Sequence, residues 1–207
     1  MCIFFIYSHY TVKQPQKLKD LLTHTERLIQ KAQEKDIIER AKENPRHFQP
    51  LYDKYYTQIF RFLLKRHAAI DLAEELCSQC FLKALTKLYQ YKPKKGAQFS
   101  SWLYKIALNE SNAFFRAQKK STLILLEENI SESIMDEVSS NYTQDETEQL
   151  SQAVQKLKKK QVELLQLRFY EGLSFKEIGE VLDITENNAK VKCYRIIDQL
   201  RLLITKS

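Results

Sequence analysis

Two groups of residues have the types and spacing that catalysis or metal binding would require. Cys77 and Cys80 form a CxxC, the spacing of a redox pair or of half a zinc site. No second CxxC occurs and the histidines show no ligand spacing, so we expect both thiols to pack inside a helix. Asp71, Glu74 and Glu75 resemble paired catalytic acids, but they lie in line on one predicted helix without a nearby nucleophile or histidine. We therefore predict no catalytic residues, no metal site, no cofactor and no enzymatic activity.

Glycine and proline are scarce, with 3 glycines and 4 prolines in 207 residues. Phosphate-binding loops need several neighbouring glycines that adopt positive φ, whereas Gly96, Gly172 and Gly179 stand apart. This excludes a Rossmann or P-loop nucleotide site. So few glycines and prolines also argue against a β-sandwich or a β-barrel, because those folds need many turns. The chain is 43% hydrophobic and 29% charged, which is typical of a globular protein. We predict an all-α fold.

The charges suggest binding to a polyanion. The whole chain carries a formal charge of +7, but residues 51–120 carry +8, residues 121–150 carry −8 and residues 151–207 carry +4. Two basic modules that face nucleic acid, joined by an acidic connector that avoids it, would produce this distribution. Ordinary solvated helix faces are the alternative explanation on charge alone.

The last predicted helix has the pattern of a DNA-reading helix. Ala189, Cys193 and Ile196 belong to its apolar stripe. A short turn joins it to a preceding helix, which is the outline of a helix-turn-helix. The opposite face, near the N-terminus, carries the candidate duplex-binding residues: Asn187, Asn188, Lys190, Val191, Lys192, Tyr194 and Arg195. Long cationic and amide side chains there can reach base edges and phosphates in a major groove. A solvated amphipathic helix remains the alternative.

The other basic block mixes cations with aromatic residues, a combination that suits single-stranded DNA because unpaired bases stack on rings. Some of these rings, Phe99 and Trp102 above all, must also serve the core. The candidate single-strand residues in this block are Tyr91, Lys94, Lys95, Trp102, Lys105, Arg116, Lys119 and Lys120.

Apolar periodicity and capping residues predict the helices and the domains. We expect a helix over 16–35, a second from Asp36 to the Asn44–Pro45 step, and a third over 47–67. Further helices are expected after the caps Asp71 and Ser100, over 150–157 and 161–170, from Ser174, and from Thr185 to Leu203. The predicted organisation is two helical domains, at 36–120 and 150–207, joined by an acidic linker at 121–149 and preceded by a helical N-terminal extension at 1–35.

Three stretches in order resemble a known family. They are DLAEELCSQCF (Asp71–Phe81), FSSWLYKIALN (Phe99–Asn109) and LRFYEGLSFKEIGEVLDIT (Leu167–Thr185). They are similar to motifs of bacterial RNA polymerase sigma factors of the extracytoplasmic-function (ECF) group in the sigma-70 family, the small members with only sigma regions 2 and 4. The resemblance covers about Asp36 to Leu203.

The resemblance implies a sigma factor that binds core RNA polymerase, recognises the −10 and −35 promoter elements, melts the promoter and starts transcription. The β′ clamp and the β flap would be its polymerase contacts, and an anti-sigma factor a possible further partner. The clamp-docking residues would be Asp71, Glu74, Glu75 and Gln79. The loop Tyr89–Gln98 would capture a flipped −10 base, and Trp102, Lys105, Asn109 and Arg116 would line the melted strand. The last helix would read the −35 duplex.

Two other functions remain open from the sequence. A helix-turn-helix regulator would bind duplex DNA without polymerase, and an inhibitor of another sigma factor would bind no DNA. The four cysteines, the absence of a recognisable secretory signal and the absence of any apolar run of about 18 residues predict a cytoplasmic protein without membrane insertion.

Overall fold

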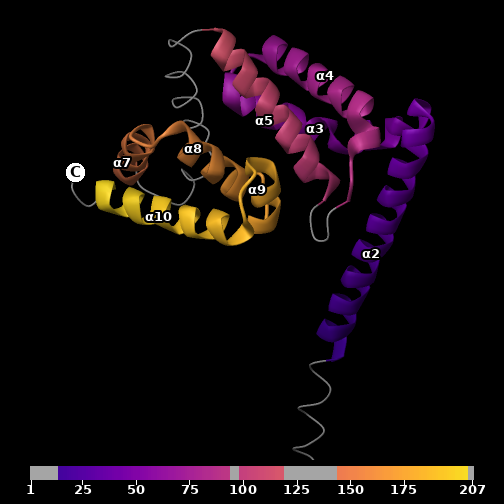
Figure 1. Ribbon diagram of the computed structural model, residues 1–207. Helices are drawn as coiled ribbons and strands as arrows, with labels where there is room; N and C mark the ends of the chain where they lie inside the picture. Colours follow the sequence, from indigo (N-terminus) through magenta and orange to yellow (C-terminus); the bar gives the residue numbers. More distant parts are fainter. Residues whose placement is uncertain (1–13, 94–97, 119–143, 205–207) are drawn as a thin grey trace, which may run out of the picture. The chain divides into compact units, whose positions relative to one another are not determined.

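The computed structural model describes residues 14–93, 98–118 and 144–204, and within these ranges the chain is helical without a β-strand (Figure 1). The α-helices are α2 (Gln14–Glu43), α3 (Gln49–His67), α4 (Ile70–Lys87), α5 (Phe99–Ala117), α7 (Gln144–Gln155), α8 (Lys159–Leu165), α9 (Phe175–Leu182) and α10 (Glu186–Ile204). The chain divides into two compact units, residues 1–51 and residues 52–207. The predicted all-α fold is confirmed for the described residues.

The first unit contains α2, which is one continuous helix. The two helices predicted to meet at Asp36 are therefore wrong as separate elements. No glycine or proline interrupts the chain there, and Asp36 forms an i,i+4 ion pair with Arg40 at 2.7 Å, which stabilises an uninterrupted helix. The predicted stop before the Asn44–Pro45 step is confirmed. The Asn44 side chain caps the following 3-10 helix by accepting a hydrogen bond from the Arg46 backbone N–H at 3.1 Å.

Helices α3, α4 and α5 bury apolar stripes in a common core of the second unit. The buried residues include Ile59, Phe62, Leu63, Ala73, Leu76, Cys80, Ala84, Leu103 and Ala107. The predicted caps Asp71 and Ser100 are wrong, because α4 begins at Ile70 and α5 begins at Phe99, so the N-cap positions lie two residues earlier. Ala69 and Gln98 occupy the N-cap positions without a side-chain hydrogen bond.

Helices α7 to α10 pack around a second set of apolar residues, among them Val154, Leu157, Val162, Leu164, Ile178, Val181, Ala189 and Ile196. Helix α7 begins at Gln144, inside the predicted linker, and the helix predicted over 161–170 is α8 followed by a π-helical turn at Gln166–Tyr170. Gly172 adopts φ +63°, a left-handed conformation that is common where a helix ends.

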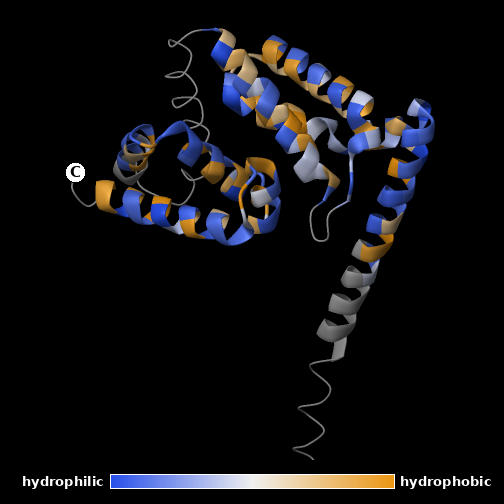
Figure 2. Ribbon diagram, in the orientation of Figure 1, coloured by the Kyte–Doolittle hydropathy of each residue, from blue (hydrophilic) through white to orange (hydrophobic). Residues whose placement is uncertain are grey.

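The helix-turn-helix is confirmed. Ser174, where this helix was predicted to begin, forms a capping box with Glu177 at the start of α9: the Glu177 carboxylate accepts from the Ser174 backbone N–H at 2.9 Å, and the Glu177 N–H donates back to the Ser174 hydroxyl. Along α10, hydrophobic and hydrophilic residues alternate at helical spacing (Figure 2).

None of the helices in the described ranges has the length and apolar character that crossing a bilayer demands.

Candidate nucleic-acid interface

The first candidate surface is the N-terminal half of α10. Its stripe of Ala189, Cys193 and Ile196 is buried against the rest of the domain. All of the predicted duplex-binding residues are exposed, namely Asn187, Asn188, Lys190, Val191, Lys192, Tyr194 and Arg195. The structure therefore leaves a row of cationic, amide and aromatic side chains on one face of a helix. That row has the geometry a major groove accepts.

A tight turn fixes the start of α10 against α9. Asp183 adopts a left-handed conformation with φ +55°, which Asp tolerates better than most residues. The Ile184 backbone N–H donates to the Gly179 carbonyl at 3.0 Å. Gly179 allows the backbone of the turn to approach α9 this closely, since a Cβ at position 179 would lie 2.7 Å from the Ile184 carbonyl oxygen. The Thr185 hydroxyl then accepts from the Asn188 backbone N–H at 3.2 Å, as predicted for the cap of this helix.

The second candidate surface lies on α5. Asn109 and Arg116 are exposed, while Trp102 and Lys105 are half-buried. The residues follow one another at three-, four- and seven-residue steps, so they form a line along one side of the helix. The predicted single-strand residues Lys94, Lys95, Lys119 and Lys120 lie outside the described residues.

A cleft of about 280 Å³ opens beside this line. Its lining residues are Gln90, Tyr91, Lys92, Gln98, Ser101, Trp102, Lys105 and Glu180. Tyr91 is only 8% exposed, and its ring packs against Phe99 and Trp102 at centroid distances of 5.1 and 5.2 Å. Aromatic walls with an amine at the rim are the surroundings that an unstacked base favours.

One residue that lines the cleft, Ser101, has an unsatisfied polar group beneath its surface. Among the described residues, Ser101 has a buried hydroxyl without a hydrogen-bond partner. Such groups are rare in folded proteins and are available to a ligand that reaches them. Gln90, Lys92 and Gln98 belong to the loop Tyr89–Gln98, which the family resemblance assigns to capture of a flipped base. Ser101 is not among the residues predicted from the sequence to bind nucleic acid, because its small neutral side chain carries no sequence signal beyond its position next to the aromatic block.

A third surface follows α4. Asp71, Glu74, Glu75 and Gln79 are all exposed, and Gln79 donates a hydrogen bond to Glu75 at 3.0 Å. Two large apolar side chains that were not predicted extend this face: Ile70 is 61% exposed and Leu82 is 63% exposed. Residues 70, 74, 78 and 82 recur every four positions, so the helical period could have identified them. An acidic helix face with apolar ends is typical of a protein-binding surface.

The CxxC is structural. Cys77 and Cys80 are fully buried in α4, and burial raises the pKa of the Cys77 thiol to about 12 and raises the pKa of Cys80 as well. The neutral thiol is therefore the stable form at physiological pH, which makes both residues poor nucleophiles and poor metal ligands. The described part of the chain contains no cluster of His, Cys, Asp and Glu able to hold a metal ion.

Family models match both helical domains. The Sigma-70 region 2 model matches residues 51–121, and the Sigma-70 region 4 model matches residues 147–200. The first match includes α4, α5 and the cleft residues other than Glu180, and the second includes Glu180 and most of the helix-turn-helix.

Curated relatives agree with the family models. The chain is 31% identical to the ECF RNA polymerase sigma factor BldN of Streptomyces coelicolor, over 82% of this chain and 65% of BldN. It is 28% identical to the RNA polymerase sigma factor YlaC of Bacillus subtilis, over 76% of this chain and 91% of YlaC. It is 26% identical to the ECF RNA polymerase sigma factor SigM of the same organism, over 75% of this chain and 94% of SigM. The chain thus spans about two thirds of BldN and nearly all of YlaC and SigM.

Solved structures share the fold. CnrH, in complex with the cytosolic domain of CnrY, superposes with a TM-score of 0.56 at 17% identity, covering 83% of this chain and 96% of that chain. The sigma factor RpoE of Bartonella quintana, in complex with the anti-sigma factor NepR, gives a TM-score of 0.50 at 17% identity, covering 76% and 96%.

Proposed function

The chain belongs to the sigma-70 family of RNA polymerase sigma factors, and on that premise we propose that it binds core RNA polymerase and directs it to promoters. Its role is to recognise the −10 and −35 elements, to stabilise the melted strand and so to permit initiation. The observation that carries this proposal is the pairing of two different surfaces in one chain. One is a groove-reading helix, and the other is an aromatic cleft for unpaired bases.

The −35 element is assigned to α10. Lys192 and Arg195 are exposed one turn apart on α10. They can contact phosphates or guanine edges in a major groove, and Asn188 can reach an adenine edge. The contacts to phosphate make the affinity fall with salt, whereas the contacts to base edges select the sequence.

The −10 element is assigned to α5 and its cleft. Trp102 and Tyr91 provide ring surfaces, Ser101 provides an unpaired hydroxyl, and Lys105 provides a charge at the rim. A flipped base can stack in the cleft while the following phosphates run along α5 past Asn109 and Arg116. Stacking on such rings contributes about 1–3 kcal/mol per base.

The polymerase contact is assigned to the exposed face of α4. We propose that Asp71, Glu74, Glu75 and Gln79 dock on the β′ clamp, with Ile70 and Leu82 as the apolar ends of the surface. The domain at 150–207 contacts the β flap, and the linker at 121–149 joins it to the domain at 36–120. The complexes of CnrH with CnrY and of RpoE with NepR support an anti-sigma factor as a further partner.

Run-off transcription tests the proposal. The protein plus core polymerase should produce promoter-specific transcripts from native genomic fragments, and core polymerase alone should not. A regulator that acts independently of polymerase would instead bind specific duplexes tightly as a free protein and produce no transcripts with core enzyme. An inhibitor of another sigma factor would show neither activity and no crosslinks to DNA.

A matched pair of α4 variants tests the docking surface. Leu82→Ala should weaken binding to core polymerase, because Leu82 is the exposed apolar end of the face. Lys87→Ala is the control, since Lys87 is exposed on the same helix but points away from the face. Equal binding by both variants and the unaltered protein would exclude this face as the docking surface.

A further inference from the structure

The centre of the exposed face of α10 is apolar. Successive residues of an α-helix lie about 100° apart around its axis, so Val191 lies about 170° from the mean direction of the buried stripe. Val191 is 39% exposed. Helix formation does not favour valine there, because a β-branched side chain loses rotamer freedom in a helix. The part of α10 that faces directly away from its own core is therefore a branched aliphatic side chain.

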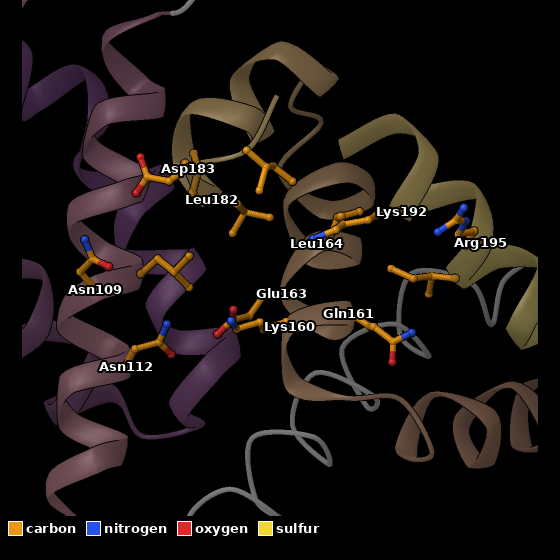
Figure 3. Close-up of a pocket in the computed structure, with 14 residues that line it drawn as sticks. Asn109, Asn112, Lys160, Gln161, Glu163, Leu164, Leu182, Asp183, Lys192 and Arg195 are labelled. Atoms are coloured by element: carbon orange, nitrogen blue, oxygen red, sulfur yellow. The ribbon is translucent and has the colours of Figure 1, made fainter. Parts of the chain in front are cut away.

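Cations lie on both sides of this apolar centre. By the same count, Lys190 and Lys192 lie about 90° and about 70° from the buried stripe, on opposite edges of the exposed face. Lys192 and Arg195 lie toward one side of the helix, since both line a groove of about 470 Å³ that also includes residues of α5, α8 and α9 (Figure 3). Val191 is not among the residues that line this groove. The helix thus presents an apolar centre between two cationic edges.

Tyr194 extends the apolar centre by one helical turn. It follows Val191 by three positions on the same side of the helix and is 54% exposed. Its ring packs against Phe175 at the start of α9, with 6.3 Å between the ring centroids. The Arg168 guanidinium lies over Phe175 at 4.7 Å from the centroid and donates to the Leu173 carbonyl at 2.9 Å. This stack restricts the position of the Tyr194 ring.

The major groove of DNA has one apolar group on its base edges, the C5-methyl group of thymine. The other groups there are hydrogen-bond donors and acceptors, which an aliphatic side chain cannot satisfy. Phosphates form the two sides of the groove, where cations at the edges of a bound helix meet them. An apolar centre between two cationic edges therefore suits a thymine. Guanine in that place would bury its N7 and O6 acceptors without a hydrogen bond.

We propose that Val191 selects a thymine in the −35 element by burying the C5-methyl group of that base against its own methyl groups. Tyr194 covers this contact from water. The inference rests on the proposed function, because it places α10 in the major groove of the −35 duplex. The −35 element of this protein then contains at least one thymine, on either strand, beneath the N-terminal half of α10. Lys190, at the edge of the face, contributes affinity through a phosphate without selecting this base.

Deoxyuridine substitution is the principal test, because deoxyuridine differs from thymidine only by the missing C5-methyl group. The −35 element is first mapped by run-off transcription with the protein and core polymerase on native genomic fragments. Each thymine of that element is then replaced in turn in a synthetic promoter duplex. Competition with the all-thymine duplex for the reconstituted holoenzyme measures the relative affinity. We expect about fourfold weaker binding at one position, the factor that burial of one methyl group implies.

Val191→Ser assigns the effect to this side chain. Position 191 is exposed, so the variant should fold, and its melting curve by circular dichroism checks this. Serine lacks the two methyl groups, so the variant should bind the thymine and deoxyuridine duplexes equally. Lys190→Ala is the matched control on the same face: it should weaken binding to both duplexes by the same factor and keep the preference for the methyl group. The comparison is a double-mutant cycle between one side chain and one methyl group.

Tyr194 has its own pair of variants. Tyr194→Phe retains the ring and should retain the preference for thymine. Tyr194→Ser should reduce that preference to less than about twofold, because water then reaches the methyl group. A residue that only stabilised α10 would lower the melting temperature without changing the ratio of the two affinities. Equal ratios in both variants would exclude the covering role of this ring.

The outcomes separate this inference from the proposed function. A preference for thymine that disappears in Val191→Ser and persists in Lys190→Ala supports the inference. A −35 element without thymine, or one whose thymines can all become deoxyuridine without effect, overturns it and leaves promoter recognition intact. A preference that persists in Val191→Ser assigns the methyl group to another residue and also overturns it. Absence of promoter-specific transcripts contradicts the proposed function itself, and the inference fails with it.

Discussion

Replacing Gly179 by alanine should lower the stability of the helix-turn-helix and, in addition, its affinity for duplex DNA. An added Cβ would lie 2.7 Å from the Ile184 carbonyl oxygen, 3.4 Å from the Glu186 nitrogen and 3.5 Å from the Thr185 carbonyl carbon. These are backbone atoms, so no rotamer change can remove the overlap. The turn itself must move by several tenths of an ångström, and it carries the first residues of α10 with it.

The energetic balance is between overpacking and helix propensity. Overpacking a tight contact costs about 1–3 kcal/mol, while alanine in a helix gains about 1 kcal/mol over glycine. We therefore expect a net loss of up to about 2 kcal/mol in the free energy of unfolding. For a chain of this size that lowers Tm by up to about 8 °C.

Gly172→Ala is the matched control. Its Cβ would meet no atom within 4 Å, but φ is +63°, so the substitution costs stability through backbone strain alone. Both variants should melt earlier by circular dichroism. Only Gly179→Ala should also lose affinity, by about tenfold, for a duplex that carries a −35 element mapped by run-off transcription. A Gly179→Ala protein that melts later and binds the duplex normally would refute the close approach.

Three further predictions concern individual surfaces. Lys192→Ala combined with Arg195→Ala should lower the salt dependence of duplex binding by about two units in the log–log slope, whereas Arg201→Ala should not change it, as titration with NaCl will show. Trp102→Ala should weaken binding of a single strand by about 1–3 kcal/mol in anisotropy titrations while Trp102→Phe retains most of it, and equal affinities would exclude stacking on this ring. Burial, together with two nearby cations, lowers the pKa of His67 to about 4. The free energy of unfolding should therefore be constant above about pH 7 and fall by up to about 2 kcal/mol from pH 6.5 to 4. Denaturant titrations should show that His67→Gln abolishes this loss.

The helices that the sequence predicted best are those whose signals are local. The stripe of Ala189, Cys193 and Ile196 identified both faces of α10, and the Ser174–Glu177 capping box identified the start of α9. Both signals depend on residues within one or two helical turns, and the structure confirms them. The prediction of Asp71 as a cap was wrong, because α4 begins two residues earlier than that cap implies, and a helix can begin without a side-chain cap when tertiary packing stabilises its first turn.

The cleft was predicted only in part, because its lining comes from distant segments. Trp102 and Lys105 belong to a recognisable basic and aromatic block. Ser101, by contrast, is distinguished only by a buried hydroxyl without a partner, which no pattern in the sequence reveals. The carboxylate of Glu180 is 75 or more positions from the other lining residues, and its place at the cleft depends on the packing of α9 against α5.

The contact between Arg66 and Glu163 shows why such a link escapes prediction and why it matters. The two residues are 97 positions apart, and each sits at a helical position where an exposed charge would be unremarkable. Burial makes the pair consequential, because Arg66 is 0% exposed and its guanidinium donates to Ser111, Asn112, Gln166 and Glu163. Removing the Glu163 carboxylate would leave a buried charge without its ionic partner, which is strongly destabilising.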